Sequence, residues 1–224
     1  MEEKSILTIG DSTIDQIICI DKENAALSVN KRTREKEICF NYGEKIPVSE
    51  TNRDFGGSAL NVAIGFARQN IKTYIATIVG NDEEGKEVLD FLHKNKVLLN
   101  GSAVNGKTNQ AFIILYDSER TILSHHEQRN YNKIKIPKTD WIYFASAAKG
   151  AEILVDKLIT SAKSGARIVF NPGSWELEKF PLFAPLVKWC EIFIINRDEA
   201  DLIFGPKEIS LQLKEMKSLG AKIN

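Results

Sequence analysis

The chain of 224 residues has little cysteine: Cys19, Cys39 and Cys190 are its only three, and their spacing is irregular. A disulfide framework or a cysteine-rich zinc site needs more cysteines at short, regular spacings, so neither is expected. The three residues are predicted instead to be buried free thiols in a protein of a reducing compartment.

An excess of charge of one sign is also absent, because 30 Lys and Arg residues balance 30 Asp and Glu residues. No overall field therefore favours nucleic acid or a membrane surface as a partner. The short basic stretch 31–34 is followed by Glu35 and Glu37, which is typical of a solvated loop. No apolar run approaches the ~20 residues of a membrane span. Since Met1–Lys4 also lacks the apolar stretch of a signal peptide, a cytoplasmic protein is expected.

Several catalytic motifs are missing. The sequence has no Gly-x-x-x-x-Gly-Lys-Ser/Thr loop and no Gly-x-Gly-x-x-Gly after its first strand, which argues against a P-loop nucleotide site and a dinucleotide dehydrogenase. It has no Gly-x-Ser-x-Gly elbow of a serine hydrolase. His125 and His126 are adjacent on a predicted strand and point to opposite faces, so they are expected to be exposed hairpin residues without a shared metal.

What is present is an alternation of apolar strands and amphipathic helices, with 43% hydrophobic residues to fill a core. Strands are expected over 5–9, 16–20, 73–79, 141–145, 167–171 and 192–196. Helices are expected over 83–94, 152–164, 197–204 and 211–219, with a proline-rich helical stretch before Trp189. This alternation predicts an α/β fold with a mostly parallel sheet covered on both faces.

Two hairpins interrupt the alternation and are expected to form a small separate β layer. One would join 37–42 to 44–48 around Gly43, and the other would join 110–116 to 121–125 through a polar turn. The polar residues 22–36 are predicted to be loop or short helix.

The segment 55–67 contains a glycine pair, Gly56 and Gly57, that leads into a helix apolar nearly all round. Such a helix is predicted to be buried, with Asn61 as a buried amide that needs a hydrogen-bond partner. The glycines let the backbone approach a ligand, whose hydroxyl groups could supply that partner. A tight turn under a core helix, with Asn61 bonded to backbone, is the alternative.

Polar residues follow several predicted strands at their carboxyl ends, where open α/β sheets bind ligands. They are Asp11, Asp15, Asn81, Asp82, Asn171, Asn196 and Glu199. Asp15 could accept hydrogen bonds from two sugar hydroxyls, and Asn196 with Glu199 could order a hydrated Mg²⁺ beside phosphates. Each residue also has a simpler role open to it, since Asp82 and Asn196 could be helix N-caps and Asp11 a turn residue.

Five segments, taken in order, resemble motifs of the ribokinase/PfkB family of carbohydrate and nucleoside kinases. They are 10–15 (GDSTID), 55–61 (FGGSALN), 78–85 (IVGNDEEG), 171–172 (NP) and 196–200 (NRDEA). Each segment alone is weak, but five in order with suitable spacing are specific, and the resemblance covers essentially the whole chain.

The resemblance implies a three-layer αβα fold with a small β lid formed by segments 16–20, 37–49 and 110–125, through which many members dimerise. It implies an ATP- and Mg²⁺-dependent kinase of a sugar or nucleoside hydroxyl, with no nucleic acid or membrane partner. The acceptor-binding residues would be Thr13, Asp15, Gly56, Gly57, Ser58 and Asn61. Asn196 would lie near the nucleotide phosphates, and Glu199 would hold Mg²⁺ through water.

The chain departs from the family because its 224 residues contain no Gly-Ala-Gly-Asp signature, which in members supplies the anion hole and the catalytic base. No catalytic residue is therefore assigned in this chain. Gly220 is predicted to close the last helix, and 221–224 to begin a strand that stops, so residues 1–224 are expected to be a partial ribokinase-like domain, inactive alone. A nucleoside kinase and a non-catalytic sugar-binding or regulatory module remain alternatives.

Overall fold

The computed structural model describes residues 4–100 and 106–223. Expectations for Met1–Glu3 and for Asn224 lie outside the described residues. The central sheet has six strands in the order β12-β11-β10-β1-β6-β7, and every neighbouring pair is parallel. Their bounds are β1 Ser5–Ile9, β6 Lys72–Ala76, β7 Leu98–Leu99, β10 Trp141–Phe144, β11 Arg167–Phe170 and β12 Cys190–Phe193.

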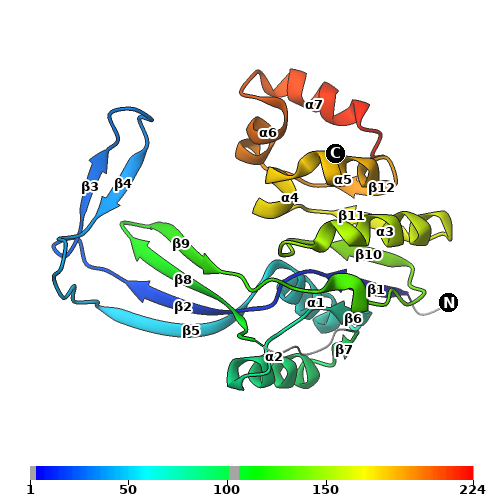
Figure 1. Ribbon diagram of the computed structural model, residues 1–224, viewed down its shortest axis with the longest axis horizontal. Coiled ribbons are helices and arrows are strands. Elements are labelled where there is room, and N and C mark those ends of the chain that lie inside the picture. The colour runs from blue at the N-terminus through cyan, green and yellow to red at the C-terminus, as the bar shows by residue number, and fades with distance from the viewer. Residues whose placement is uncertain (1–3, 101–105, 224) are drawn as a thin grey trace.

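Helices cover both faces of this sheet, as the alternation predicted (Figure 1). Successive residues of a strand point to opposite faces, so Phe144 packs into one core and Ala145 into the other. The core that holds Ala145 lies under α1 (Ser58–Arg68) and α2 (Glu83–Lys94). The core that holds Phe144 lies under α3, α5 and α7. The remaining helical elements are η1 Tyr131–Lys133, η2 Ala151–Ile153, α3 Leu154–Lys163, α4 Ser174–Glu178, α5 Phe180–Val187, α6 Arg197–Phe204 and α7 Ile209–Ser218.

The core under α3 and α5 is rich in aromatic rings. Phe144 and Phe170 stack with ring centroids 5.1 Å apart, and Phe170 and Phe193 stack at 5.6 Å. Of the three cysteines only Cys190 is buried, and it lies in this core. The prediction that all three thiols are buried is therefore wrong, because Cys39 is exposed and Cys19 is half-buried on strands outside the main core.

A second, four-stranded sheet has the order β5-β2-β8-β9 and extends away from the central sheet (Figure 1). It consists of β2 Thr13–Cys19, β5 Glu50–Gly56, β8 Asn109–Tyr116 and β9 Glu119–His125. The β8–β9 hairpin predicted over 110–125 is confirmed, with Asp117 and Ser118 at positive φ as a tight hairpin turn requires. Only the β2–β8 pair of this sheet is parallel among its described pairs.

The other predicted hairpin is wrong. β4 (Lys36–Cys39) pairs with β3 (Ala26–Val29), which lies inside the stretch expected to be loop or short helix, and 44–48 forms no strand. The two-stranded β3–β4 arm is almost entirely exposed, so neither strand carries the apolar alternation that reveals a half-buried strand. The sequence does not predict β5 for a related reason, since the first five residues of this strand are polar and exposed.

Helix α1 is buried on one face only, which corrects the prediction of a buried helix. Ala59, Leu60, Ala63 and Ile64 are buried, whereas Asn61 is exposed. The exposed positions of α1 are Ser58, Asn61, Gly65 and Arg68, whereas Val62, Phe66 and Ala67 are half-buried. Within residues 4–100 and 106–223, no helix has the length and apolarity needed to cross a membrane.

Candidate acceptor and nucleotide sites

The glycine pair packs against the chain that leaves β1. Gly57 has φ 96°, and a Cβ there would overlap the backbone of Asp11 and Ser12. Any other residue would therefore be strained by its φ and would push the turn away from this backbone. Gly57 also precedes α1 and offers no capping side chain, so backbone N–H groups of the first turn are left for other partners.

Gly56 makes room for Asp15. A Cβ at Gly56 would overlap the Asp15 carboxylate, which is half-buried and accepts a hydrogen bond from Thr13 Oγ1 at 2.6 Å. Thr13 pairs with Gly56 across the β2–β5 ladder, so the two strands bring the glycine pair and the carboxylate together. Ser58 and Asn61 follow on exposed positions of α1. The structure thus gathers the six residues predicted to bind an acceptor.

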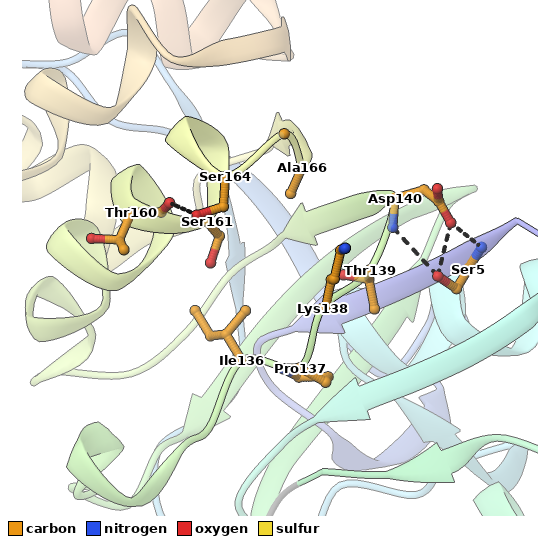
Figure 2. Close-up of a pocket in the computed structure, with 11 residues that line it drawn as sticks. Ser5, Ile136, Pro137, Lys138, Thr139, Asp140, Thr160, Ser161, Ser164 and Ala166 are labelled. Atoms are coloured by element: carbon orange, nitrogen blue, oxygen red, sulfur yellow. Dashed lines mark hydrogen bonds between the residues drawn. The ribbon is translucent and has the colours of Figure 1, made fainter.

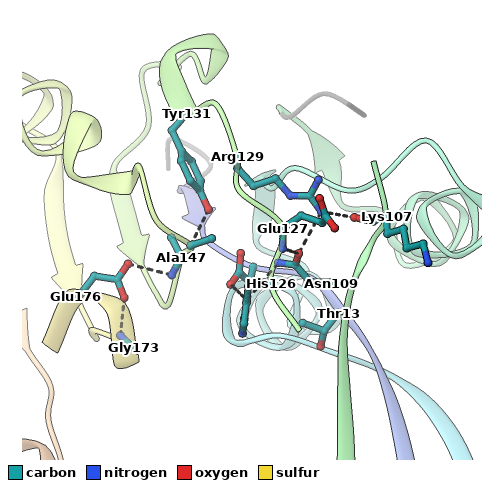
Figure 3. A network of polar contacts seen from close by, with 12 residues as sticks. Thr13, Lys107, Asn109, His126, Glu127, Arg129, Tyr131, Ala147, Gly173 and Glu176 are labelled. Atoms are coloured by element: carbon teal, nitrogen blue, oxygen red, sulfur yellow. Dashed lines mark hydrogen bonds and ion pairs between the residues drawn. The ribbon is translucent and has the colours of Figure 1, made fainter. Parts of the chain in front are cut away.

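A polar network lies beside this group, at the carboxyl end of β1 (Figure 3). Asp11, whose side chain is 6% exposed, forms an ion pair with His126, with 3.1 Å between Oδ2 and Nδ1. The hydrogen bond to Asp11 raises the pKa of His126 above its usual value. His126 is exposed, as predicted, but it follows the end of β9 and pairs with Asp11, so it is not a residue of the hairpin. His125 is also exposed and contacts only Glu127 among the described ion pairs.

Hydrogen bonds of Asn109 and Arg129 connect the loop after β9 to the start of β8. Asn109 Oδ1 accepts hydrogen bonds from the Glu127 backbone N–H at 2.9 Å and from the Arg129 guanidinium at 3.1 Å. The same guanidinium donates to the Lys107 carbonyl at 2.7 Å. Arg129 is 5% exposed, and burial lowers its pKa without removing its charge. This loop is therefore held in place by buried, charge-assisted hydrogen bonds.

Glu176 is a buried carboxyl that the sequence analysis did not select. It is fully buried at the start of α4 and accepts hydrogen bonds from the backbone N–H groups of Gly173 (2.9 Å) and Ala147 (3.2 Å). Burial raises its pKa from 4.5 to about 7. A capping-box reading of 173–176 could have found it, because a Glu three residues after a cap position reaches back to the cap N–H.

A cavity of about 340 Å³ adjoins this network at the same edge of the sheet. Its lining includes Ser124, His126, Glu127, Ser146, Lys149 and Trp175. A second cavity of about 570 Å³ lies at the amino ends of β1 and β10, beside Ser5 and Asp140 (Figure 2). There, Asp140 accepts hydrogen bonds from the Ser5 N–H and hydroxyl at 2.8 and 2.9 Å, which connect the starts of β10 and β1. These hydrogen bonds lower the pKa of Asp140. Ligands of open α/β sheets bind at the opposite edge, so the smaller cavity is the better candidate.

Asn196 and Glu199 form a capping box at the start of α6. Asn196 Oδ1 accepts from the Glu199 N–H at 2.9 Å, and Glu199 Oε2 accepts from the Asn196 N–H at 2.8 Å. Asp82 likewise caps α2, accepting from Gly85 N–H at 2.9 Å. It also accepts from the Thr108 N–H and hydroxyl at 2.7 and 2.6 Å. Burial alone would raise the pKa of Asp82, but these hydrogen bonds outweigh it and lower that pKa. The simpler cap role is thus present for both residues.

Residues 15–224 match the family described as pfkB family carbohydrate kinase. The chain belongs to this family. The pfkB-family assignment confirms the resemblance seen in the sequence, and the α/β fold with its parallel sheet agrees with it.

The chain is also similar to a kinase in sequence and to solved ribokinase structures in fold. The pfkB-family chain is 26% identical over 229 aligned positions to an ATP-dependent 6-phosphofructokinase of Thermoanaerobacterium thermosaccharolyticum, covering 93% of this chain and 70% of that protein. Its fold is similar to ribokinase from Giardia lamblia, with a TM-score of 0.76, 20% identity, and coverage of 98% and 68%. It is also similar to ribokinase from Cryptococcus neoformans in complex with ADP, with a TM-score of 0.69, 17% identity, and coverage of 100% and 72%.

The described part of this pfkB-family chain contains no cluster of three or more His, Cys, Asp or Glu side chains that could hold a metal ion directly. A Mg²⁺ ion bound mainly through water and phosphate needs few protein ligands. The single carboxyl of Glu199 is compatible with such a site, but not with a site made of protein ligands alone.

Proposed function

We propose that this pfkB-family chain binds a sugar at Asp15 and the Gly56–Gly57 turn, as the acceptor site of an ATP-dependent carbohydrate kinase. The observation that carries the proposal is the Asp15 carboxylate, which accepts a hydrogen bond from Thr13 and lies over Gly56 on β2, the strand that follows the carboxyl end of β1. A fixed, half-buried carboxylate can accept hydrogen bonds from two neighbouring hydroxyl groups, which a sugar offers and an apolar ligand does not.

The remaining acceptor contacts would come from the first turn of α1. Ser58 and Asn61 are exposed there, so their hydroxyl and amide can exchange water for ligand hydroxyl groups at little desolvation cost. The backbone N–H groups that follow Gly57 add further donors. Donors on one side and the Asp15 acceptor on the other suit a polyhydroxylated molecule.

The proposed cofactors are ATP and Mg²⁺, which when bound supply the transferred phosphoryl group and neutralise its charge. Asn196 would lie near the phosphates, and Glu199 would contact Mg²⁺ through water. The ADP complex of the Cryptococcus ribokinase supports a nucleotide in a protein of this fold. The capping box uses Glu199 Oε2, so a water-mediated contact would come from the other carboxyl oxygen.

The second sheet is proposed to be the lid over the acceptor, since it carries Asp15 and ends at the glycine pair. Its exposed side chains include Phe112, Ile122 and Leu123, which suit pairing with a second copy of the chain. A lid that excludes water would favour transfer to the sugar over hydrolysis. The proposed setting is the cytoplasm.

Calorimetric titration of the chain with ribose, fructose, fructose 6-phosphate and adenosine tests the proposal. Binding of at least one sugar is expected, with a loss on the order of 2–4 kcal/mol in Asp15→Asn because a charge-assisted acceptor is removed. Asp90→Asn, on the exposed face of α2, is the matched control and should bind like the parent. Binding of adenosine alone would favour a nucleoside kinase, and no binding of any of the four would reject the acceptor site.

A non-catalytic sugar-binding or regulatory module remains the second candidate, because the 224 residues contain no Gly-Ala-Gly-Asp signature to supply a base. Sugar binding without any ATP consumption, by this chain and by the chain fused to a Gly-Ala-Gly-Asp segment of a family member, would favour that candidate.

A further inference from the structure

The loop after β9 connects the second sheet to the central sheet through a partly buried ion pair. His126 comes from this loop and is 38% exposed, whereas its partner Asp11, at the end of β1, is 6% exposed. The Asp11 backbone N–H donates to the Ser146 carbonyl at 2.8 Å, so the aspartate is anchored on the central sheet. A buried charge is costly unless an opposite charge compensates it, and the imidazole of His126 forms the ion pair with Asp11 Oδ2, which has no hydrogen-bond partner within the described residues.

The charged and polar groups that face His126 come from several elements. They are Asp11 of the β1 end, Asn109 of β8, Glu127 and Arg129 of its own loop, Glu176 of α4 and Lys149 across the cavity. The guanidinium of Arg129 is engaged by Lys107 and Asn109, so it does not replace the imidazole at Asp11 among these contacts. Because Asp11 and Glu176 are both buried acids, a cationic imidazole is favoured at this position.

We propose that His126 is a positioning residue of the acceptor site: in its protonated form it holds Asp11, and Asp11 holds the Gly56–Gly57 turn in place. The link from Asp11 to the turn is direct contact, since the backbone of Asp11 and Ser12 is what a Cβ at Gly57 would strike. The role in acceptor binding rests on the proposed function, whereas the position of the turn does not.

The sign of the pH dependence follows from the direction of the shift. The pKa of His126 in the folded chain lies above its ordinary 6.5, chiefly because of the hydrogen bond with Asp11. The stabilisation of the folded chain by the His126–Asp11 ion pair is therefore complete below about pH 6.5. It is lost as the pH rises through the pKa of His126 in the folded chain. The turn is expected to loosen over that upper range.

Nuclear magnetic resonance of the ligand-free chain tests the inference without any sugar. The ring signals of the three histidines, assigned with His93→Gln and His125→Gln, should show His126 titrating above pH 6.5 and shifting to lower pH in Asp11→Asn. The backbone amide signals of Gly56 and Gly57 should change with the same midpoint. In His126→Gln these amides should lose that titration, whereas in His125→Gln they should keep it.

Two results would overturn the inference. One is a His126 ring that titrates at or below pH 6.5 in the parent chain, a measurement that needs no variant at Asp11. The other is a pair of glycine amides that do not follow the His126 midpoint. The raised pKa of Glu176, about 7, lies in a neighbouring range, so Glu176 could also change the glycine amide signals. The difference between the amide titrations of His126→Gln and of the parent chain therefore decides the question, and not the parent titration alone.

A second measurement separates this inference from the proposed function. If a sugar binds, its Kd in the parent should rise on the order of tenfold between about pH 6 and pH 9, and this rise should be smaller in His126→Gln. If no sugar binds, the proposed function fails, and the amide titration still decides whether His126 positions the turn.

Discussion

At the residue scale, two glycines, the half-buried Asp15 carboxylate and the backbone of Asp11 decide how the candidate site is built. Gly56 leaves space for the Asp15 side chain, and Gly57 lets the turn lie on the backbone of Asp11. The ligand-binding and the purely structural explanations of the glycine pair are therefore not exclusive. The close approach that packs the glycine turn against the backbone also places the Asp15 carboxylate, a hydrogen-bond acceptor, beside that turn.

Gly57→Ala should destabilise the chain by about 2–4 kcal/mol, because a φ of 96° is costly for alanine and its Cβ would strike backbone atoms. Gly43→Ala is the matched control, since Gly43 has φ 78° but open space around it, and should cost only about 1 kcal/mol. Urea denaturation of both variants measures the difference. Equal losses would show that the contact with Asp11 contributes nothing.

The raised pKa of Glu176 predicts how the free energy of unfolding changes with pH. Its pKa is raised from 4.5 to about 7 by burial, so between these values the folded chain binds more protons than the unfolded chain. Stability should therefore fall as the pH rises through this window, by about 3 kcal/mol from this group. Glu176→Gln removes the titration, and its unfolding free energy should fall less over the same range. Parallel pH profiles of the two proteins, measured by denaturation, would contradict the prediction.

At the element scale, helix caps account for residues in two of the five segments that resemble family motifs. α6 begins with a reciprocal pair of hydrogen bonds between Asn196 and Glu199, and α2 begins at Asp82, which also binds Thr108. A cap and a ligand contact can use different atoms of one side chain, so each role needs its own measurement.

Two substitutions at Asn196 separate these roles. Asn196→Ala removes the acceptor for the Glu199 N–H and should cost about 1 kcal/mol of stability. Asn196→Asp keeps a capping oxygen and should melt like the parent, yet its added negative charge should weaken ATP binding if the residue lies near the phosphates. Unchanged ATP affinity in Asn196→Asp would remove this residue from the nucleotide site.

At the scale of the whole molecule, apolar side chains remain exposed at the β12 end of the central sheet. Ile223 forms an isolated parallel bridge with Ile192 of β12, and Leu202, Leu211 and Leu213 are about half exposed or more. Exposed apolar side chains gathered at one end of the molecule favour association between copies.

The 224-residue chain is predicted to transfer no phosphoryl group, because the part of the family pattern that supplies a base and an anion hole is absent from it. It should also associate or precipitate when expressed alone. An ATP-consumption assay over sugars and nucleosides, with a longer chain that carries the Gly-Ala-Gly-Asp signature as positive control, tests the first point. Light scattering tests the second. Turnover by the 224 residues would show that another carboxylate acts as the base.

The sequence by itself determined the α/β class, the β8–β9 hairpin and the start of α2 and α6, because local periodicity, turn residues and caps encode such elements. Only the tertiary structure decided that the polar strand β5 pairs with β2 and that the β3–β4 arm exists, since exposed strands carry no apolar alternation. It also decided the contact of His126 with Asp11 and the burial of Glu176. These depend on segments far apart in the chain that meet at one edge of the sheet, which no local pattern records.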